Sequence, residues 1–389
     1  MPLAAILVLH ASAFQVALLT TIDFLPFLLF SLPAGVWVDR LPRRPILIVG
    51  DLGRAAALVS IPIVAAFGGL TIGQLYVVGF ITGTLTVFFD VAYQSYLPSL
   101  VEREQLGDAN GKLEVSRSGA QLAGPGLAGL LVGAVTAPYA IVADAVSFVG
   151  SAAFVGAIRR GERVRNPPVE RPRMRQEIAE GLRYVLGHPY LRPSMAYVAI
   201  ANFSSNLLFS IFLVYAVREL RLSVTTIGLF FSLSNLGFLV GAVTANRLSL
   251  LLGIGRTMVG SAAIGGSALL LIPLAPRSLA VPFIVIAIAV TGGCGVIYNV
   301  TGISLMQAIT PDRLLGRMNA SRRFVVWGVI PLGGLAGGAL ASQIGLRPTI
   351  WVGAIGVSVA FVPLFFSPVR GLIHLPEEAP PLATVVTDA

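Results

Sequence analysis

Cysteine, histidine and charge are all scarce in this chain of 389 residues. The single cysteine, Cys294, lies inside an apolar run, which excludes a disulfide framework and a thiolate metal site. The three histidines, His10, His188 and His374, are too scattered along the sequence to predict a metal cluster. No pair of a nucleophile and a general base is discernible. The sequence therefore predicts no metal, no cofactor and no enzymatic activity.

Charged residues make up 12% of the chain and hydrophobic residues 56%, whereas soluble proteins are about 25% charged. This composition predicts a polytopic membrane protein. The net charge of +9 does not indicate nucleic acid as a partner, because the basic residues gather on one side of the predicted membrane. That side is the cytoplasm with its anionic lipid surface. Alternation of the loops leaves only four of the 27 basic residues outside: Arg218, Arg221, Arg277 and Arg347.

The first half of the chain contains half of one apolar run followed by five complete ones. Residues 1–9 are apolar, but a membrane span needs about 20 residues. We interpret them as the outer half of a first helix whose inner half is missing, which leaves about 11.5 spans in the whole chain. They lack the basic leader and cleavage site of a signal peptide. The complete runs cover residues 14–38, 46–67, 71–97, 111–135 and 138–158.

A basic insert at residues 159–192 separates the two halves. Within it, Ile178, Leu182 and Val185 have helical spacing, which predicts an amphipathic helix on the cytoplasmic face. Joining the two halves would be a sufficient role for this helix. Six further apolar runs cover residues 193–217, 225–246, 256–275, 279–306, 319–343 and 348–367, and the proline-rich remainder, 368–389, is predicted to be a disordered cytoplasmic tail.

The two halves repeat each other. Parallel repeats joined by one long cytoplasmic loop predict two six-helix bundles, 1–158 and 193–367, with a central cavity between them. The repeat is visible at an offset of 209 residues, where Leu106, Gly107 and Asn110 recur as Leu315, Gly316 and Asn319.

The loop at residues 35–44 reads Gly-Val-Trp-Val-Asp-Arg-Leu-Pro-Arg-Arg. A polar loop this short between two apolar runs forms a tight hairpin at the membrane surface. Asp39 stands at the C-terminal end of its helix, where the macrodipole repels a carboxylate, so it needs a positive partner. Nearby arginines, or the N-terminus of a helix on the same side, are the candidates. The loop resembles the signature loop between helices 2 and 3 of the major facilitator superfamily, with Pro42 in place of one glycine.

The resemblance implies the major facilitator fold and a gate on the cytoplasmic side, although a basic hairpin that only obeys topology rules is the alternative. Asp51 and Arg54 are i, i+3 neighbours in the next run, and Asp90 lies near the inner end of the run after it. These three predict an ion-pair cluster that latches the gate rather than binding substrate. The predicted gate residues are Gly35, Asp39, Arg40, Arg43, Arg44, Asp51, Arg54 and Asp90.

The run at 111–135 contains small residues at intervals of four and a proline that bends the helix. It looks like the antiporter motif of the superfamily, which in that family accompanies export, although two alanines replace glycines of the motif. Small-residue packing with no bearing on direction is the alternative. The motif positions are Gly111, Ala120, Gly124, Pro125, Ala128 and Gly129.

Among the carboxylates within predicted spans, where an ionisable group is costly, two are candidates for carrying a proton. Asp23 falls near the bilayer midplane and could carry a proton; a neutral, hydrogen-bonded acid or a cavity-lining group is the alternative. Asp144 is the second proton candidate. The second half shows no charge in the middle of a run, and its polar positions either line a cavity or pack between helices. With one aromatic residue of the first half, the cavity-lining candidates are Tyr93, Asn202, Asn206, Asn235, Tyr298 and Asn299.

Stretches at 25–30, 89–98, 109–114 and 144–148 resemble exporters related to enterobactin and macrolide efflux proteins. This resemblance implies a multi-pass protein of the bacterial plasma membrane that works as a monomer surrounded by lipid. It implies secondary active efflux of a small apolar or amphipathic molecule, such as a drug or siderophore, in exchange for protons by alternating access. A proton-symporting importer and a non-transporting membrane receptor are the alternatives.

Overall fold

A computed structural model of the chain describes residues 1–38, 41–100, 106–158 and 182–374. Within these ranges the regular structure is helical, without strands, and ten helices are long and apolar enough to cross a membrane. Part of a further helix, Leu122–Val135, is a shorter apolar stretch. The predicted all-α membrane fold is confirmed.

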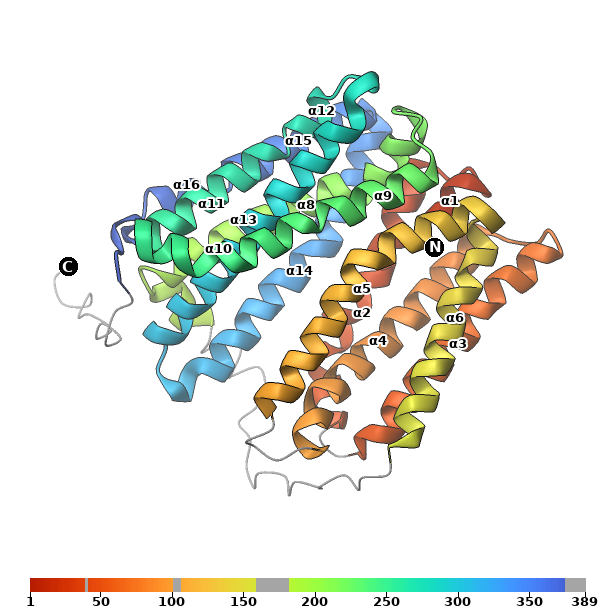
Figure 1. Cartoon of the computed structure of the whole chain (residues 1–389), viewed down its shortest axis with the longest axis horizontal. Helices are drawn as coiled ribbons and strands as arrows, with labels where there is room; N and C mark the ends of the chain where they lie inside the picture. The colour runs from red at the N-terminus through yellow and green to blue at the C-terminus, as the bar shows by residue number, and fades with distance from the viewer. Residues whose placement is uncertain (39–40, 101–105, 159–181, 375–389) are drawn as a thin grey trace. The chain divides into compact units, whose positions relative to one another are not determined.

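Each apolar run of the first half forms one helix (Figure 1). Glycine and proline lie at some of the ends, as their backbone preferences require. Gly68, with a φ of +70°, follows one helix, and Pro138 lies in the first turn of another. The helices are α1 (Pro2–Leu7), α2 (Ala13–Val38), α3 (Arg43–Ala66), α4 (Ile72–Leu100), α5 (Leu106–Val135) and α6 (Ala137–Ala157).

The runs of the second half also form helices, three of them divided into two pieces. The run predicted at 225–246 is interrupted at Asn235, and the helix that begins at Asp312 starts seven residues before the predicted run at 319. The helices are α8 (Leu191–Arg218), α9 (Val224–Ser234), α10 (Leu236–Leu252), α11 (Ile254–Ala268), α12 (Leu271–Leu274), α13 (Ala280–Ile309), α14 (Asp312–Ile344), α15 (Leu346–Val359) and α16 (Val362–Phe365), with 3-10 turns η2 (Arg277–Leu279) and η3 (Pro368–Gly371).

The chain divides into two compact units. Their boundaries do not follow the predicted bundles, because parts of α8, α9 and α14 belong to the first unit. The first unit contains Met1–Glu170, Phe209–Ser232 and Gly334–Leu346, and the second contains Arg171–Leu208, Leu233–Gly333 and Arg347–Ala389.

In the first unit, α4 packs against α2 and α3, and α3 also packs against α6. These helices run side by side in Figure 1, coloured from red to yellow. Leu19, Leu58 and Leu75, one from each of three helices, are buried in a shared apolar core. In the first unit α3 therefore packs against both α4 and α6.

In the second unit, α13 packs against α10 and α11. Glycines allow the backbones of α10 and α13 to approach, since a Cβ on Gly241 would overlap the backbone of Gly293. Met258 and Ile309 are fully buried in the core of this unit. The α13 helix is thus surrounded on two sides, and its remaining faces carry the polar residues described below.

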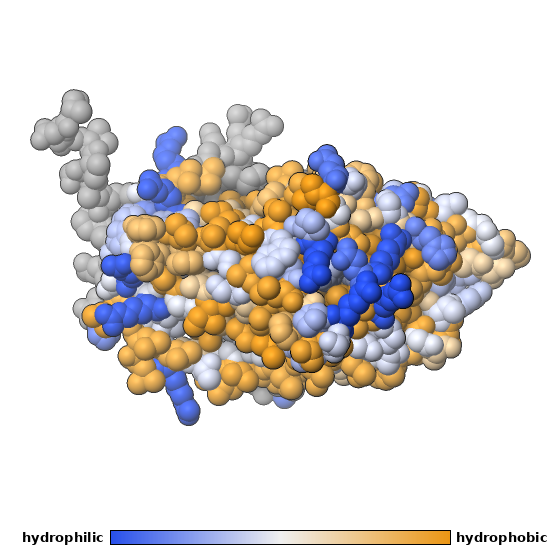
Figure 2. All heavy atoms as spheres, turned by 90° about the horizontal axis from the view of Figure 1, so that it is seen from above, coloured by the Kyte–Doolittle hydropathy of each residue, from blue (hydrophilic) through white to orange (hydrophobic). Residues whose placement is uncertain are grey.

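Large apolar side chains cover much of the exterior. Phe154, Leu250 and Leu251 are each about four-fifths exposed, at 79%, 78% and 80%. Figure 2 shows hydrophobic residues over much of one face of the molecule. Soluble monomers rarely expose so much contiguous apolar surface, whereas lipid tails cover such a surface in a membrane.

The beginning of the predicted disordered tail is ordered, which corrects the boundary at residue 368. The turn η3 forms there, and Val369 is fully buried. The backbone N–H groups of Ile254 and Gly255 donate to the carbonyls of Ile373 and Leu372 at 3.2 and 2.8 Å. These bonds satisfy donors at the start of α11 that the helix itself leaves unpaired, which explains why the chain stays attached. Residues 375–389 lie outside the described ranges.

Only the end of the predicted amphipathic helix can be compared with the structure. Residues 159–181 lie outside the described ranges, and residues 182–187 are helical. Val185 is fully buried, and the hydroxyl of Tyr184 donates to the carbonyl of Ile309 at 2.8 Å. This helix end is therefore hydrogen-bonded to the C-terminal end of α13.

Candidate functional site

The signature loop connects α2 to α3. Gly35 belongs to the last turns of α2, whereas Asp39 and Arg40 lie outside the described residues. The geometry of the predicted carboxylate latch is therefore not part of the described structure, and its role remains a prediction.

The other two arginines of the loop begin α3. Pro42 caps this helix with extended backbone, and Arg43 and Arg44 form its first turn. Arg44 donates from Nη2 to the carbonyl of Gly156, at the C-terminal end of α6. Carbonyls at the end of a helix carry partial negative charge, so they attract a guanidinium. This bond attaches the N-terminal end of α3 to the C-terminal end of α6.

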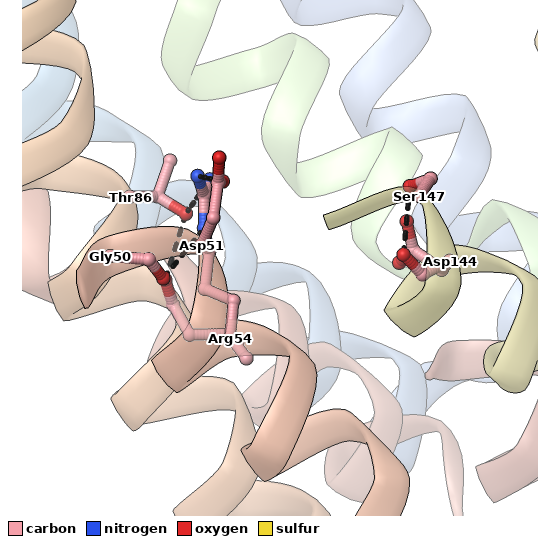
Figure 3. A network of polar contacts seen from close by, with 7 residues as sticks. Gly50, Asp51, Arg54, Thr86, Asp144 and Ser147 are labelled. Carbon is pink, nitrogen blue, oxygen red and sulfur yellow. Dashed lines mark hydrogen bonds and ion pairs between the residues drawn. The ribbon is translucent and has the colours of Figure 1, made fainter. Parts of the chain in front are cut away.

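Farther along α3, Asp51 and Arg54 form a buried ion pair (Figure 3). The Nη2 of Arg54 lies 2.5 Å from Oδ1 of Asp51, and both side chains are almost fully buried. The other carboxylate oxygen of Asp51, Oδ2, has no hydrogen-bond partner among the described residues. The sequence spacing of three places both groups on one face of the helix.

Neighbouring helices complete the surroundings of Arg54. Its Nη1 donates to the hydroxyl of Thr86 on α4 at 3.3 Å. The guanidinium carbon lies 4.3 Å from the ring centroids of both Phe89 on α4 and Phe148 on α6, so two aromatic faces enclose the cation. Asp90, the third member of the predicted cluster, is within electrostatic range of Arg54. The arrangement holds three helices together around one positive charge.

Asp23 faces α4, where glycine leaves room for it. A Cβ at Gly79 would overlap Oδ1 of Asp23, and a Cβ at Gly83 would overlap its backbone carbonyl. Oδ1 of Asp23 is buried and has no hydrogen-bond partner among the described residues. The two glycines, one turn apart, therefore create the space in which this carboxyl lies.

Asp144 has a different environment on α6. The residue is exposed, and its backbone carbonyl accepts a hydrogen bond from the hydroxyl of Ser147 at 2.7 Å. Figure 3 shows this pair on the helix next to the Asp51–Arg54 network. Asp144 also lies within electrostatic range of Arg54. The two proton candidates thus differ in burial: one is enclosed between helices and the other is open.

The small residues of α5 contact α9, but not through the face that the spacing of four predicts. Ala120 and Ala128 are exposed, and a Cβ at Gly124 would meet no atom within 4 Å. Instead, a Cβ at Gly129 would lie 2.9 Å from the Cα of Gly228 on α9.

A hydrogen bond reinforces this contact. Next to Pro125, the N–H of Gly126 donates to the hydroxyl of Ser232 at 2.8 Å. A proline inside a helix disturbs the local hydrogen bonds, which allows a donor to turn to a neighbouring helix. Gly111 also lies in α5, before this contact region.

Several cavity candidates make local contacts. The side-chain amides of Asn202 and Asn206 donate to carbonyls one turn earlier on α8, at 2.8 Å each. Tyr93 is exposed and stacks on Phe89 with 6.1 Å between ring centroids. Asn235 occupies the interruption between α9 and α10.

The remaining two candidates are adjacent on α13 but point to different surroundings. Tyr298 is buried in the core of the second unit, whereas Asn299 is exposed. Asn299 accepts a hydrogen bond from Nη2 of Arg322 on α14 at 2.9 Å. Sequence reasoning missed Arg322, because hydropathy places it at the edge of a run and not inside a helix. The structure places it ten residues after the start of α14, a start that hydropathy does not show.

The family comparison agrees with this architecture. A family profile described as "transmembrane secretion effector" matches residues 4–378. The chain belongs to this family of the major facilitator superfamily. It is therefore a multi-pass membrane transporter, as the sequence predicted, and the relatives give no support to an enzymatic reading.

Curated relatives share moderate identity with this chain. The multidrug efflux pump Tap of Mycolicibacterium fortuitum is 26% identical over 370 residues, which cover 91% of this chain and 88% of Tap. Macrolide efflux protein A of Streptococcus pyogenes is 30% identical over 174 residues, 44% of this chain and 42% of that protein. The second alignment therefore concerns less than half of either protein.

Solved structures show the same fold. A bacterial homologue of the iron transporter ferroportin, in an inward-facing state, superposes with a TM-score of 0.73 at 18% identity, covering 94% of this chain and 92% of that one. The nucleoside transporter NupG superposes with a TM-score of 0.71 at 11% identity, covering 93% of this chain and 91% of that one. At this identity the likeness concerns the fold alone.

Proposed function

We propose that this protein is a secondary active transporter that exports a small apolar or amphipathic molecule in exchange for protons. The observation that carries the proposal is the alignment with an efflux pump, Tap, over most of both chains. Macrolide efflux protein A, a second relative, also has a name that refers to efflux. A drug-like molecule is therefore the substrate class that we expect.

Transport would proceed by alternating access, with the protein as a monomer in contact with membrane lipids. The internal repeat at an offset of 209 residues supports two bundles of six helices that rock about a central cavity. Substrate and protons would bind the two orientations with different affinity, which is the only way a ligand shifts such an equilibrium. Gly129, which contacts α9, is also a position of the antiporter-like motif, and we expect this motif to accompany export.

In the proposed mechanism, Asp39 and the arginines of its loop latch the cytoplasmic side. The bond from Arg44 to Gly156 supports this role, because it already attaches the loop side of α3 to another helix. The buried Asp51–Arg54 pair then stiffens α3 behind the loop. The substitution Asp39→Asn would keep the shape of the side chain but remove the charge that the arginines attract.

Asp23 is the proposed proton carrier, with Asp144 as the second candidate. The enclosed oxygen of Asp23 without a hydrogen-bond partner supports the assignment, since such a group gains by taking up a proton. The test uses inverted membrane vesicles with an acidic lumen, a panel of macrolides and other drugs, and a pH-sensitive dye. For the wild type we expect drug accumulation in the lumen together with loss of the pH gradient.

Matched variants distinguish the roles. Asp23→Asn should abolish gradient-driven accumulation while leaving drug exchange down its own gradient, and Asp144→Asn shows whether the second carboxyl is needed. Asp39→Asn should slow every mode of transport without preventing membrane insertion. Drug leaving the vesicles with protons would indicate an importer, and binding without flux would indicate a receptor. Gradient-driven accumulation that survives both carboxyl variants would contradict the proposed proton carriers.

A further inference from the structure

The guanidinium of Arg322 lies within α14, among the apolar helices of the second unit. Arg322 is ten residues from the start of α14, and Asn299 is ten residues from the end of α13. At about 1.5 Å per residue, each lies roughly 15 Å along its helix from the cytoplasmic end. Nη2 of Arg322 donates to Oδ1 of Asn299 at 2.9 Å. The hydrogen bond therefore joins two neighbouring helices in their inner third.

The amide does not neutralise the charge of Arg322. Within the part of the chain that the structure describes, no carboxylate forms an ion pair with this guanidinium. A guanidinium has five N–H donors, and the oxygen of Asn299 accepts from one nitrogen only. A cation among membrane helices is costly unless it is paired or lies in a water-filled cavity. Its natural complement is an anion that comes from outside the chain.

Asn299 adds a donor to the same place. Because its Oδ1 accepts from Arg322, its Nδ2 group faces away from the guanidinium and retains two N–H groups. The residue is exposed although its helix is apolar, which is expected for a cavity wall. Among the described residues, the arrangement thus presents donors from two helices and no carboxylate paired with them.

Open space adjoins these donors. Gly295 lies one turn before Asn299 on α13, and a Cβ at this position would meet no atom within 4 Å. The neighbouring residue Tyr298 is fixed, because its hydroxyl donates to the carbonyl of Ser194 at 3.4 Å and its ring lies 4.3 Å from that of Tyr197. The space beside Gly295, one turn from Asn299, is therefore free for a ligand.

We propose that Arg322 and Asn299 bind the anionic group, a carboxylate or phosphate, of an amphipathic molecule whose apolar part lies beside Gly295. A guanidinium binds such groups through two parallel hydrogen bonds. The transported solute and an anionic lipid headgroup both supply this chemistry. The interpretation that the anionic group belongs to the transported solute rests on the proposed function. It narrows the expected substrates of the transporter to amphipathic acids.

The test compares one ligand skeleton with and without its charge. The full chain in nanodiscs of zwitterionic lipid is titrated with pyrenebutyric acid and with its methyl ester, and binding is followed by pyrene fluorescence. We expect the acid to bind about tenfold more tightly than the ester, the ratio that one charge-assisted hydrogen-bonded contact commonly provides. Equal affinities for the two probes would overturn the proposal.

Variants assign the preference to the site. Arg322→Gln should abolish the preference for the acid, and Arg322→Lys should keep part of it because lysine is a point charge without the planar fork. Arg256→Gln, at an exposed arginine of α11, is the matched control and should keep the full preference. A preference that persists in Arg322→Gln would overturn the assignment.

The space beside Gly295 is tested separately. Gly295→Leu should weaken the binding of both probes, because the side chain fills the room for the pyrene group. A Cβ at Gly260 on α11 would also meet no atom within 4 Å, so Gly260→Leu is the control for the general effect of a larger side chain. Unchanged binding in Gly295→Leu would contradict the proposed position of the apolar part.

Two further arms separate the sources of the anion. In nanodiscs that contain phosphatidylglycerol, a lipid ligand would compete with the acid and reduce its preference in the wild type, whereas a solute site would keep it. Flux of the ester in vesicles, with no preference for the acid in binding, would leave the proposed efflux intact and refute this inference. A preference in binding without any flux would support the anion site and refute the proposed efflux.

Discussion

Arg54 and Arg322 both belong to membrane helices, and their surroundings differ in almost every respect. Arg54, in the first unit, is bonded to the carboxylate of Asp51 and enclosed by the rings of Phe89 and Phe148. Arg322, in the second unit, is bonded to a neutral amide. Arg54 is buried at 6% exposure, whereas Arg322 keeps partial access.

The comparison distinguishes a charged side chain that is paired inside the protein from one that is free to bind a ligand. A buried ion is tolerated only when an opposite charge and hydrogen bonds offset its desolvation. Arg54 meets that condition inside the chain and has little left to offer a ligand. Arg322 does not meet it with the described residues, so its binding capacity remains available. The same residue type therefore stabilises one unit and supplies a recognition site in the other.

The sharpest test of this comparison removes each guanidinium in turn. Arg54→Gln should lower the free energy of unfolding by about 3–5 kcal/mol, because it leaves the buried carboxylate of Asp51 without its partner. Arg322→Gln should change stability by no more than about 0.5 kcal/mol, since its partner is neutral and exposed. Both are measured as denaturant-induced unfolding in detergent.

The double variant Asp51→Asn/Arg54→Gln is the control for the first result. Its loss of stability should be smaller than the sum of the losses of the two single variants. Each single variant leaves one buried charge without its partner, whereas the double variant leaves no buried charge at this site. Equal losses for Arg54→Gln and Arg322→Gln would remove the distinction between the two sites.

A smaller loss of stability is expected when one of the two aromatic rings around Arg54 is removed. Phe148→Leu keeps an apolar side chain on α6 but removes a ring that lies 4.3 Å from the guanidinium carbon of Arg54. A desolvated cation–π contact contributes up to about 2 kcal/mol, so the loss should be about 1–2 kcal/mol. Phe154→Leu, at a residue of the same helix that is 79% exposed, is the control. If both substitutions cost the same, the ring acts only by its size.

The smallest expected effect is on the pH dependence of stability, and it concerns His188, a buried side chain that stays neutral, unlike Arg54 and Arg322. Burial lowers the pKa of His188 below its ordinary value of 6.5, and its Nδ1 accepts a hydrogen bond from the N–H of Tyr190. Below about pH 6.5 the unfolded chain takes up a proton that the folded chain does not, so stability falls as the pH decreases.

His188→Phe keeps a ring between Tyr184 and Tyr190 but cannot take up the proton. Thermal unfolding in detergent at a series of pH values from neutral to mildly acidic should therefore show a shallower decline for this variant than for the wild type. An identical decline in both proteins would mean that His188 does not contribute to the acid sensitivity.

The helices were largely predictable because apolar runs of membrane length leave the backbone no alternative. The Asp51–Arg54 pair was predictable for a related reason: its spacing of three is a local property of one helix. The rings around Arg54 were not, since Phe89 and Phe148 come from other helices and only tertiary packing brings them together.

Other features could not be predicted from the sequence, and the physical reason differs for each. Small residues occupy several faces of α5, and periodicity does not show that Gly129, rather than Gly124, meets another helix. Hydropathy marks where a run becomes apolar, not where a helix begins, so α14 starts at Asp312 and includes Arg322. The tail beyond Ser367 has the composition of a disordered segment, yet its residues Leu372 and Ile373 accept hydrogen bonds from the first N–H groups of α11.

The contact between Gly129 and Gly228 has a consequence for mutational tolerance. Most helix contacts can absorb a larger side chain on one partner if the other becomes smaller. Here both partners are already the smallest residue, and a Cβ on Gly228 would lie 2.8 Å from the Cα of Gly129. No second substitution at this pair can therefore rescue a first one, and alanine at either position forces the two helices apart.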